Sequence, residues 1–369
     1  MTGRGVDIDR RPVLIMAGGT GGHVYPALAV ANALRQQSRD VVWLGTRRGI
    51  EARVVPAAGI DIEWLSVEGL RGKGALALLA APFKLIRALL QAIRIMARQN
   101  PAAVLGMGGF ASGPGGVAAW LTRRPLLIHE QNAAAGLTNR LLARLARVVL
   151  QAFPGSFSSN VAAETVGNPV REDIAAVSPP RERYAERSGP LRLLVLGGSQ
   201  GALSLNRIVP AALALLAADE RPVVRHQSGE RTRPAAEAAY ADSGIDVELT
   251  TFIEDMAEAY AWADLVVCRS GALTVAELCA VGLPALLVPF PHAVDDHQTA
   301  NARPMANAGA AEILSESGLT EQSMAERLRE WLSDRVQLEK RAERARELAE
   351  PDSLARIAAH CQSLAGAAA

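Results

Sequence analysis

The sequence predicts an α/β protein with two doubly wound parallel sheets in tandem and a cleft between the two lobes. One observation is the alternation of short, nearly continuous apolar runs with helical patterns through most of the 369 residues. Such runs are typical of parallel strands covered by helices on both faces. The other observation is a repeat, because "GGTGG" at 18–22 and "GGSQG" at 197–201 each follow directly on an apolar run. The same strand, glycine turn and helix start is therefore built twice.

Each lobe contributes five predicted strands. Those of the first lobe are expected at 12–17, 41–45, 102–108, 125–130 and 147–153. After a polar break at 166–190, those of the second lobe are expected at 191–198, 222–229, 247–253, 264–271 and 284–290. From about 323 onward the chain is charged and helical, without a strand pattern. A chain of this length can hold two domains with separate cores.

Charge is distributed unevenly along the chain. Residues 1–160 hold 19 of the 39 Lys and Arg but only 8 of the 38 Asp and Glu, although the net charge is +1. The basic first half is expected to face an anionic partner. Nucleic acid is disfavoured because aromatic residues are not interleaved with the basic ones. An anionic membrane surface or a phosphorylated acceptor fits better.

Cysteine usage and the N-terminus indicate the compartment. The three cysteines have no C-x-x-C spacing, which favours neither a disulfide framework nor a zinc site. No long apolar segment precedes the first predicted strand, so no signal peptide is expected. We interpret the chain as cytosolic.

The two glycine clusters are candidate anion-binding turns. In doubly wound sheets, ligands bind beyond the carboxyl ends of strands, where glycines let backbone N–H groups approach an anion. Neither cluster is G-x-G-x-x-G, because Val24 and Ser199 stand where glycines would be required, and no Walker lysine follows Gly22. A dinucleotide-dependent dehydrogenase and a P-loop NTPase are therefore disfavoured. The alternative is that the glycines only make tight turns.

Further polar or glycine-rich segments are expected on the same rims. In the first lobe they are "GMGGFASGPGG" at 106–116 and "HEQN" at 129–132. In the second lobe they are "CRSGALTVAELCAVGLP" at 268–284 and "PFPHAVDDHQTANA" at 289–302. Because each follows a predicted strand, we expect the two rims to face each other across the cleft.

Seven segments together resemble the MurG family of glycosyltransferases. They are "MAGGTGGHVYPALA" (16–29), "GLRGKG" (69–74), "GMGGFASGPGG" (106–116), "HEQNAAAGLTN" (129–139), "VGNPVR" (166–171), "GGSQGA" (197–202) and "CRSGALTVAEL" (268–278). The resemblance, from about residue 12 to about 350, implies the GT-B fold. It also implies an inverting transfer of GlcNAc from UDP-GlcNAc to the C4 hydroxyl of MurNAc in undecaprenyl-pyrophosphoryl-MurNAc-pentapeptide (lipid I), which gives lipid II for peptidoglycan synthesis.

The resemblance also implies a domain plan. We expect an N-terminal domain at 1–166 that faces the acceptor and the membrane. A C-terminal domain at 167–345 is expected to bind UDP-GlcNAc. A last helix at 346–369 is expected to pack back on the N-terminal domain.

Most donor-binding residues implied by the resemblance lie in the second lobe. Ser199 and the helix start at 271–274 would hold the UDP pyrophosphate, Glu277 the ribose and Gln298 the GlcNAc hydroxyls. The implied UDP-GlcNAc set is Thr20, Gly21, Gly22, Asn132, Arg171, Ser199, Ile253, Ala272, Leu273, Thr274, Val275, Ala276, Glu277 and Gln298. The family commonly shows paired glutamines at the last position, whereas this chain has "DDHQ" at 295–298 with His297 before Gln298.

The implied chemistry is a single in-line displacement at the sugar C1, which needs no enzyme nucleophile. A helix N-terminus can stabilise the leaving UDP, and we expect neither a metal nor another cofactor. The only Asp-x-Asp, Asp7 and Asp9, precedes the first strand and is not interpreted as a metal site. His23 is the first candidate base because imidazole titrates near neutral pH, and Glu130 is the second. A histidine at such a junction can equally be a structural cap.

The acceptor pyrophosphate is expected at the 18–22 loop together with the 106–110 loop. This expectation follows from the position of the two loops on the first lobe. The residues concerned are Gly18, Gly19, Gly108 and Gly109.

The segment 73–100 is expected to form an amphipathic basic helix. Its polar face would hold Lys84, Arg87, Gln91, Arg94 and Arg98, with Leu85, Ile86, Leu89, Leu90 and Ile93 on the rest. Its longest uncharged stretch is about half of the roughly 20 residues needed to span a bilayer. We therefore expect peripheral binding at the cytoplasmic face of the inner membrane, with a similar strip at Arg140, Arg144 and Arg147. The alternative is a core helix with a solvated basic face.

Two other function classes stay open. A different GT-B enzyme, such as a sugar-nucleotide 2-epimerase or a transferase with a soluble acceptor, would share the donor half. It should lack the glycine-dense 106–116 loop and the basic helix. A non-catalytic nucleotide-sugar-binding protein would share the pocket but turn over nothing.

Overall fold

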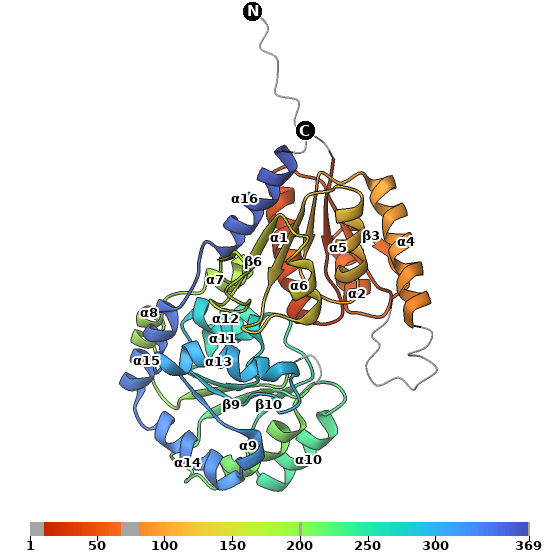
Figure 1. Cartoon of the computed structure of the whole chain (residues 1–369). Coiled ribbons are helices and arrows are strands. Elements are labelled where there is room, and N and C mark those ends of the chain that lie inside the picture. The colour runs from red at the N-terminus through yellow and green to blue at the C-terminus, as the bar shows by residue number, and fades with distance from the viewer. Residues whose placement is uncertain (1–10, 68–80, 199–200, 368–369) are drawn as a thin grey trace, which may run out of the picture. The chain divides into compact units, whose positions relative to one another are not determined.

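A computed structural model describes residues 11–67, 81–198 and 201–367 and divides the chain into two compact units (Figure 1). Unit 1 comprises Met1–Pro169 and Asp352–Ala369, and unit 2 comprises Val170–Pro351. Both boundaries lie a few residues beyond the expected ones at 166 and 345. The last helix of the chain belongs to unit 1.

Unit 1 is built on a seven-stranded, fully parallel sheet of order β3-β2-β1-β4-β5-β6-β7. Its strands are β1 (Val13–Met16), β2 (Val41–Gly45), β3 (Asp61–Trp64), β4 (Ala103–Gly106), β5 (Leu126–Glu130), β6 (Val148–Gln151) and β7 (Ala163–Thr165). Its helices are α1 (Gly21–Gln36), α2 (Glu51–Ala57), α4 (Ala81–Gln99), α5 (Ser112–Leu121), α6 (Leu137–Leu142) and α16 (Ser353–Gly366).

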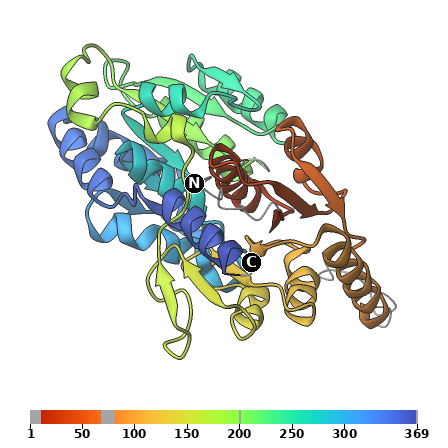
Figure 2. The same ribbon diagram turned by 90° about the horizontal axis from the view of Figure 1, so that it is seen from above.

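Helices cover both faces of this sheet. On β1, Val13 and Ile15 point to one face and Leu14 and Met16 to the other, and all four are fully buried. The first face packs against α1 and α16, and the second packs against α4, α5 and α6. Figures 1 and 2 both show α4 beside α5. The alternation on β1 is the pattern that a strand buried on both sides requires.

Unit 2 repeats the plan with a six-stranded parallel sheet of order β10-β9-β8-β11-β12-β13. Its strands are β8 (Arg192–Leu196), β9 (Val223–Gln227), β10 (Glu248–Thr250), β11 (Leu265–Cys268), β12 (Ala285–Leu287) and β13 (Ala311–Ile313). Its helices are α7 (Glu172–Ala175), α8 (Pro180–Ala185), α9 (Leu203–Ala214), α10 (Arg233–Ser243), α11 (Met256–Trp262), α12 (Ala272–Val281), α13 (His297–Asn307), α14 (Glu321–Leu332) and α15 (Arg335–Glu347), with 3-10 turns at Val294–Asp296 and Glu316–Gly318. One core joins Leu193 and Val195 of β8 to α9, α14 and α15.

The two parallel-sheet units confirm the predicted fold class, and each of the ten expected strands is present. The strands β3, β7 and β13 were not predicted from the sequence. Each is three or four residues long and lies at the edge of its sheet. Edge strands lack the continuous apolar run of a central parallel strand, so their patterns are weak.

The predicted basic helix is present as α4, but its faces differ from the expectation. Gln91 accepts the Ser66 N–H and donates to the Trp64 carbonyl, and Arg98 binds Glu63, so part of the expected polar face contacts the β3 region. Leu85, Ile86 and Leu90 are exposed instead, beside Phe83, which is 77% exposed. Ala88, Ala92, Ile95 and Met96 face the core. Small residues let α4 approach the sheet closely, which leaves the larger apolar side chains outside.

Within the described ranges, no helix combines the length and the apolar character needed to span a bilayer.

Candidate active site

The first glycine turn lies at the carboxyl end of β1, where α1 begins. Gly19 has a φ of +94°, a left-handed conformation that favours glycine. Thr20 precedes the first helical residue, and its side-chain oxygen lies 3.5 Å from Nδ1 of His23. The first N–H groups of a helix lack the usual acceptor four residues before them. Here the His23 N–H donates to the Thr20 carbonyl, so the donors that this turn offers to a ligand are the N–H groups of Gly21 and Gly22.

A second glycine loop packs directly on the first. Gly108 and Gly109 have φ values of +93° and +87°. A Cβ atom at Gly108 would lie 2.6 Å from Cδ2 of His23, and one at Gly109 would overlap the carbonyl oxygen of Gly18. Ser112 donates its hydroxyl to the Met16 and Gly108 carbonyls and fixes this loop against β1. The structure therefore brings Gly18, Gly19, His23, Gly108 and Gly109 together in unit 1.

The turn after β5 is organised by Glu130, which is only 3% exposed. Its carboxylate accepts the Asn132 N–H at 3.0 Å, the Asn132 amide at 3.2 Å, the Gly136 N–H at 3.1 Å and the Asn139 amide at 2.9 Å. The preceding His129 is fully buried, and burial lowers its pKa to about 4, so the ring is neutral at pH 7. Its Nε2 lies 2.9 Å from the Gly167 carbonyl oxygen. Both side chains hold this turn in place.

The glycine turn of unit 2 is anchored by Gln227 at the end of β9. Its Oε1 accepts the Gly198 N–H at 2.9 Å, and its amide donates to the Gly198 and Thr251 carbonyls. Gly198 has a φ of +73°. The predicted donor residue Ser199 lies outside the described residues, as do Asp7, Asp9 and the segment "GLRGKG" at 69–74.

The start of α12 forms the second element of the predicted donor site. Gly271 is the N-cap residue of α12. The helix begins with Ala272, Leu273, Thr274, Val275 and Ala276. Ser270, just before the cap, is fully buried, and its hydroxyl has no hydrogen-bond partner among the residues described. Asn301 donates to the Ser270 carbonyl and ties α13 to this turn.

Glu277 lies in the second turn of α12 and is 8% exposed. Tyr260 donates its hydroxyl to the carboxylate at 2.9 Å. Burial raises the pKa of Glu277 to about 7, while the hydrogen bond from Tyr260 and the charge of Arg171 act in the opposite direction. The carboxyl therefore changes its charge near neutral pH.

The remaining predicted donor residues lie in loops and at the starts of helices. Arg171 immediately precedes α7, and its Nη1 lies 3.7 Å from Oδ2 of Asp173. Ile253 follows β10 and is half-buried. Gln298, at the start of α13, accepts the Phe290 N–H at 2.9 Å. Thr20, Gly21, Gly22 and Asn132 belong to unit 1, and the described others belong to unit 2.

The comparisons with known proteins cover nearly the whole chain. Residues 13–151 match the glycosyltransferase family 28 N-terminal domain and residues 192–357 match its C-terminal domain. A relative from Alkalilimnicola ehrlichii, 62% identical over 95% of this chain and 98% of its own, is named UDP-N-acetylglucosamine--N-acetylmuramyl-(pentapeptide) pyrophosphoryl-undecaprenol N-acetylglucosamine transferase. One of the same name from Nitrosococcus oceani is 56% identical over 96% of this chain and 98% of its own. The crystal structure of Acinetobacter baumannii MurG superposes with a TM-score of 0.83 at 42% identity over 96% of this chain and 99% of that one.

The chain belongs to the MurG family.

Two residues that hold the glycine turns of this MurG-family protein were not found from the sequence. Gln227 holds the turn of unit 2. Glu51, at the start of α2, accepts the Gly19 N–H at 2.9 Å in unit 1. Each is distant in sequence from the turn that it contacts, and neither stands in a motif. The two residues reach the glycine turns because β2 lies beside β1 and β9 lies beside β8 in the sheets.

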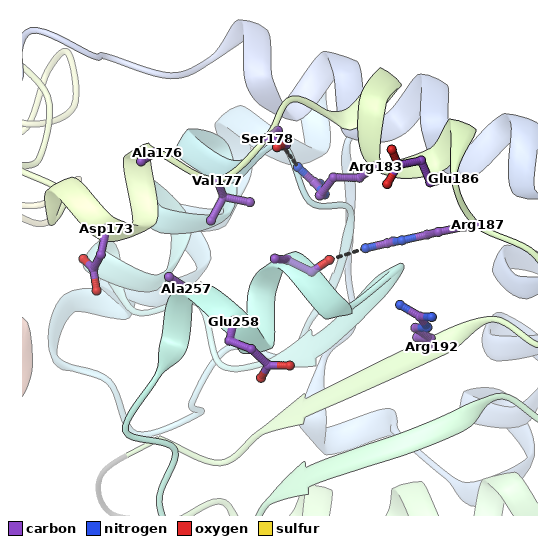
Figure 3. Close-up of a pocket in the computed structure, with 11 residues that line it drawn as sticks. Asp173, Ala176, Val177, Ser178, Arg183, Glu186, Arg187, Arg192, Ala257 and Glu258 are labelled. Carbon is purple, nitrogen blue, oxygen red and sulfur yellow. Dashed lines mark hydrogen bonds between the residues drawn. The ribbon is translucent and has the colours of Figure 1, made fainter.

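Figure 3 shows a further cavity of this MurG-family protein, which is lined by residues of unit 2. It has a volume of about 600 Å³ and is lined by Arg192, the first residue of β8, so it lies at the opposite end of that strand from Gly198. Arg187 in its wall is paired with Asp264 and donates to the Ala261 carbonyl. Arg183 donates to the Ser178 and Val281 carbonyls. These two arginines join α8 to its neighbours, and the cavity contains none of the predicted donor residues.

Proposed function

We propose that this protein transfers N-acetylglucosamine from UDP-GlcNAc to the C4 hydroxyl of the N-acetylmuramic acid in lipid I. The observation that carries the proposal is the identity of 62% over 95% of the chain with a relative whose name states this donor and acceptor. A glycine turn at the carboxyl end of β1 and another at that of β8 support it, because ligands of such sheets bind at these ends.

Unit 2 binds the nucleotide in this proposal. The N–H groups at the start of α12 and the positive end of the helix dipole face the pyrophosphate and stabilise negative charge as UDP leaves. The buried hydroxyl of Ser270 beside this helix start has no partner among the residues described, which supports a polar ligand there. Glu277 accepts hydrogen bonds from the ribose hydroxyls, and Arg171, Ile253, Gln298 and the glycine turn with Ser199 complete the donor set.

Unit 1 receives the acceptor. The loops that contain Gly18, Gly19, Gly108 and Gly109 bind the acceptor pyrophosphate. The residues of unit 1 that help to bind the GlcNAc of the donor are Thr20, Gly21, Gly22 and Asn132. His23 takes the proton of the attacking hydroxyl, and its ring lies against Gly108 and Thr20. Glu130 is the weaker candidate for the base. Its carboxylate is buried and accepts four hydrogen bonds from its own turn, which supports a positioning role.

The reaction needs no covalent intermediate. The acceptor oxygen attacks C1 of GlcNAc in line with the bond to UDP, the C1–O bond to the diphosphate breaks, and the configuration at C1 inverts. The proton of the acceptor hydroxyl passes to His23, and the electron pair of the broken bond stays on UDP.

The membrane is the third partner in the proposal. Exposed apolar side chains of unit 1 gather on α4, on the end of α5 and on α6, which contact one another in a row. We name this the α4–α6 surface, and it comprises Phe83, Leu85, Ile86, Leu90, Trp120, Leu121, Leu137 and Leu141. Lys84, Arg87 and Arg94 are exposed on α4, which carries half of these side chains. Arg140, Arg144 and Arg147 are also exposed, but they line a pocket with Phe157, Glu164 and His360. Apolar side chains beside cations are typical of a surface that lies on anionic lipid, which supports a peripheral location at the inner face of the membrane.

The experiment that tests the proposed function is UDP release from UDP-GlcNAc, measured with and without a lipid I analogue. We expect release only with the analogue. Formation of an epimerised sugar without the analogue, either free or still joined to UDP, would identify a 2-epimerase. Binding of UDP-GlcNAc with neither release of UDP nor epimerisation would identify a binding protein.

A further inference from the structure

A buried carboxylate lies directly beneath the first glycine turn. Glu51 has no exposed surface. Its Oε2 accepts the Gly19 N–H at 2.9 Å, and its Oε1 accepts the Thr46 N–H at 3.0 Å and the Thr46 hydroxyl at 2.7 Å. Without this carboxylate the buried N–H and O–H donors that it accepts would have no acceptor, which is costly in free energy.

Three glycines leave the space that this carboxylate occupies. A Cβ atom at Gly49 would overlap Oε2 of Glu51, one at Gly18 would lie 2.5 Å from Oε1, and one at Gly45 would lie 2.9 Å from Cγ. None of the three has a positive φ, so their backbone conformation does not require glycine. Their small size therefore accommodates the Glu51 side chain.

The contact with Glu51 determines the direction of the turn. It holds the Gly19 N–H toward the protein interior while Gly19 keeps its left-handed φ of +94°. The chain then enters α1, and the His23 N–H donates to the Thr20 carbonyl at 3.2 Å. A shift of Gly19 would consequently move the start of α1 and the imidazole of His23 with it. An apolar side chain at position 51 could fill the space, but it could not accept the Gly19 N–H.

We propose that Glu51 is a positioning residue for the acceptor side of the reaction. Through Gly19 it fixes the start of α1, and so it sets where His23 meets the attacking hydroxyl. The inference rests on the proposed function, because it assumes that His23 acts at this turn. It adds Glu51 to the residues proposed to support the reaction, and it explains why glycine stands at positions 18, 45 and 49.

Two variants perturb the contact in different ways. Glu51→Gln keeps the shape and one acceptor oxygen but places an NH₂ group against Thr46 or Gly19. Gly49→Ala keeps the carboxyl group and displaces it, because the new methyl group would overlap Oε2. Arg53→Ala is the matched control, since Arg53 is exposed on the same helix. Each protein is assayed for kcat and KM with a lipid I analogue and for the Kd of UDP, which is proposed to bind unit 2.

We expect kcat/KM for the acceptor to fall ten- to hundredfold in both variants, while the Kd of UDP stays within twofold and the control matches the wild type. Turnover within threefold of the wild type in both variants would overturn the inference. So would a loss of turnover accompanied by a melting temperature well below that of the control, because that result indicates a role in folding alone. A wild-type protein that forms no product with the lipid I analogue would instead refute the proposed function.

Discussion

His23 lies where the two glycine loops of unit 1 touch, so its ring is held against Gly108. For His23→Ala we expect kcat to fall about 10²- to 10⁴-fold, the usual contribution of a general base. The Kd of UDP should not change, because UDP is proposed to bind unit 2. Turnover within a few-fold of the wild type, with unchanged UDP affinity, would show that His23 is not the base.

Glu277 is expected to make binding at the proposed nucleotide site depend on pH. Burial raises its pKa to about 7, so a rise in pH through this value ionises the carboxyl. An ionised carboxylate accepts stronger hydrogen bonds from ribose hydroxyls than the protonated form does. We therefore expect UDP to bind more tightly at pH 8 than at pH 6. Isothermal titration of UDP at both pH values measures this difference.

The substitution Glu277→Gln should weaken UDP binding about tenfold at pH 8, which is the order of one charged hydrogen bond. It should also make the dependence on pH between 6 and 8 smaller than in the wild type, leaving the part that comes from the terminal phosphate of UDP. Glu343→Gln, an exposed change on α15, is the control and should behave as the wild type. A variant that retains the pH dependence of the wild type would assign it to another group.

Some residues of the candidate site could be identified from the sequence and others could not. Motifs identified the glycine turns, His23 and Glu277, because such residues stand at fixed offsets from predicted strand ends. Glu51 and Gln227 gave no such signal, since each contacts its turn from a neighbouring strand or the loop after it. The hydrogen bonds of Glu130 could not be predicted from the sequence either, and they support the proposal that its carboxylate positions its own turn.

Among the helices and strands, α4 supplies the side chains with which the proposed binding to lipid can be tested. Each Lys or Arg near anionic lipid contributes about 1 kcal/mol, so Lys84→Gln with Arg87→Gln should weaken vesicle binding by about 2 kcal/mol, or roughly thirtyfold. Phe83→Ser with Ile86→Ser should weaken it through lost apolar burial. Sedimentation with vesicles containing anionic lipid, at low and high salt, measures both effects.

The control for this experiment is Val336→Ser, since Val336 is 58% exposed but lies on α15 of unit 2. It should bind vesicles as the wild type does. If neither α4 variant differs from this control at low salt, the α4–α6 surface has another role.

The elements also show which patterns predict structure well. Central strands were recognised because burial on both faces makes them continuously apolar. The faces of α4 were not, because its core contacts are made by Ala88 and Ala92 as well as larger residues. Alanine and leucine are both apolar, so the sequence pattern does not say which of them faces the core.

At the scale of the whole molecule, the sequence predicted two similar α/β units, and the structure contains both. The repeat of strand, glycine turn and helix was the decisive signal, since each unit places its turn at the carboxyl end of a central strand. The chemistry did not follow from this pattern alone. It came from the family segments and then from the relatives that share them.

The central claim is a direct, inverting transfer of GlcNAc to a lipid-borne sugar. The most direct test is nuclear magnetic resonance of the product formed from UDP-GlcNAc and a lipid I analogue. We expect a disaccharide in which GlcNAc is joined through a β-linkage to the C4 oxygen of the acceptor sugar. An α-linkage, or a sugar released without attachment to the acceptor, would contradict it.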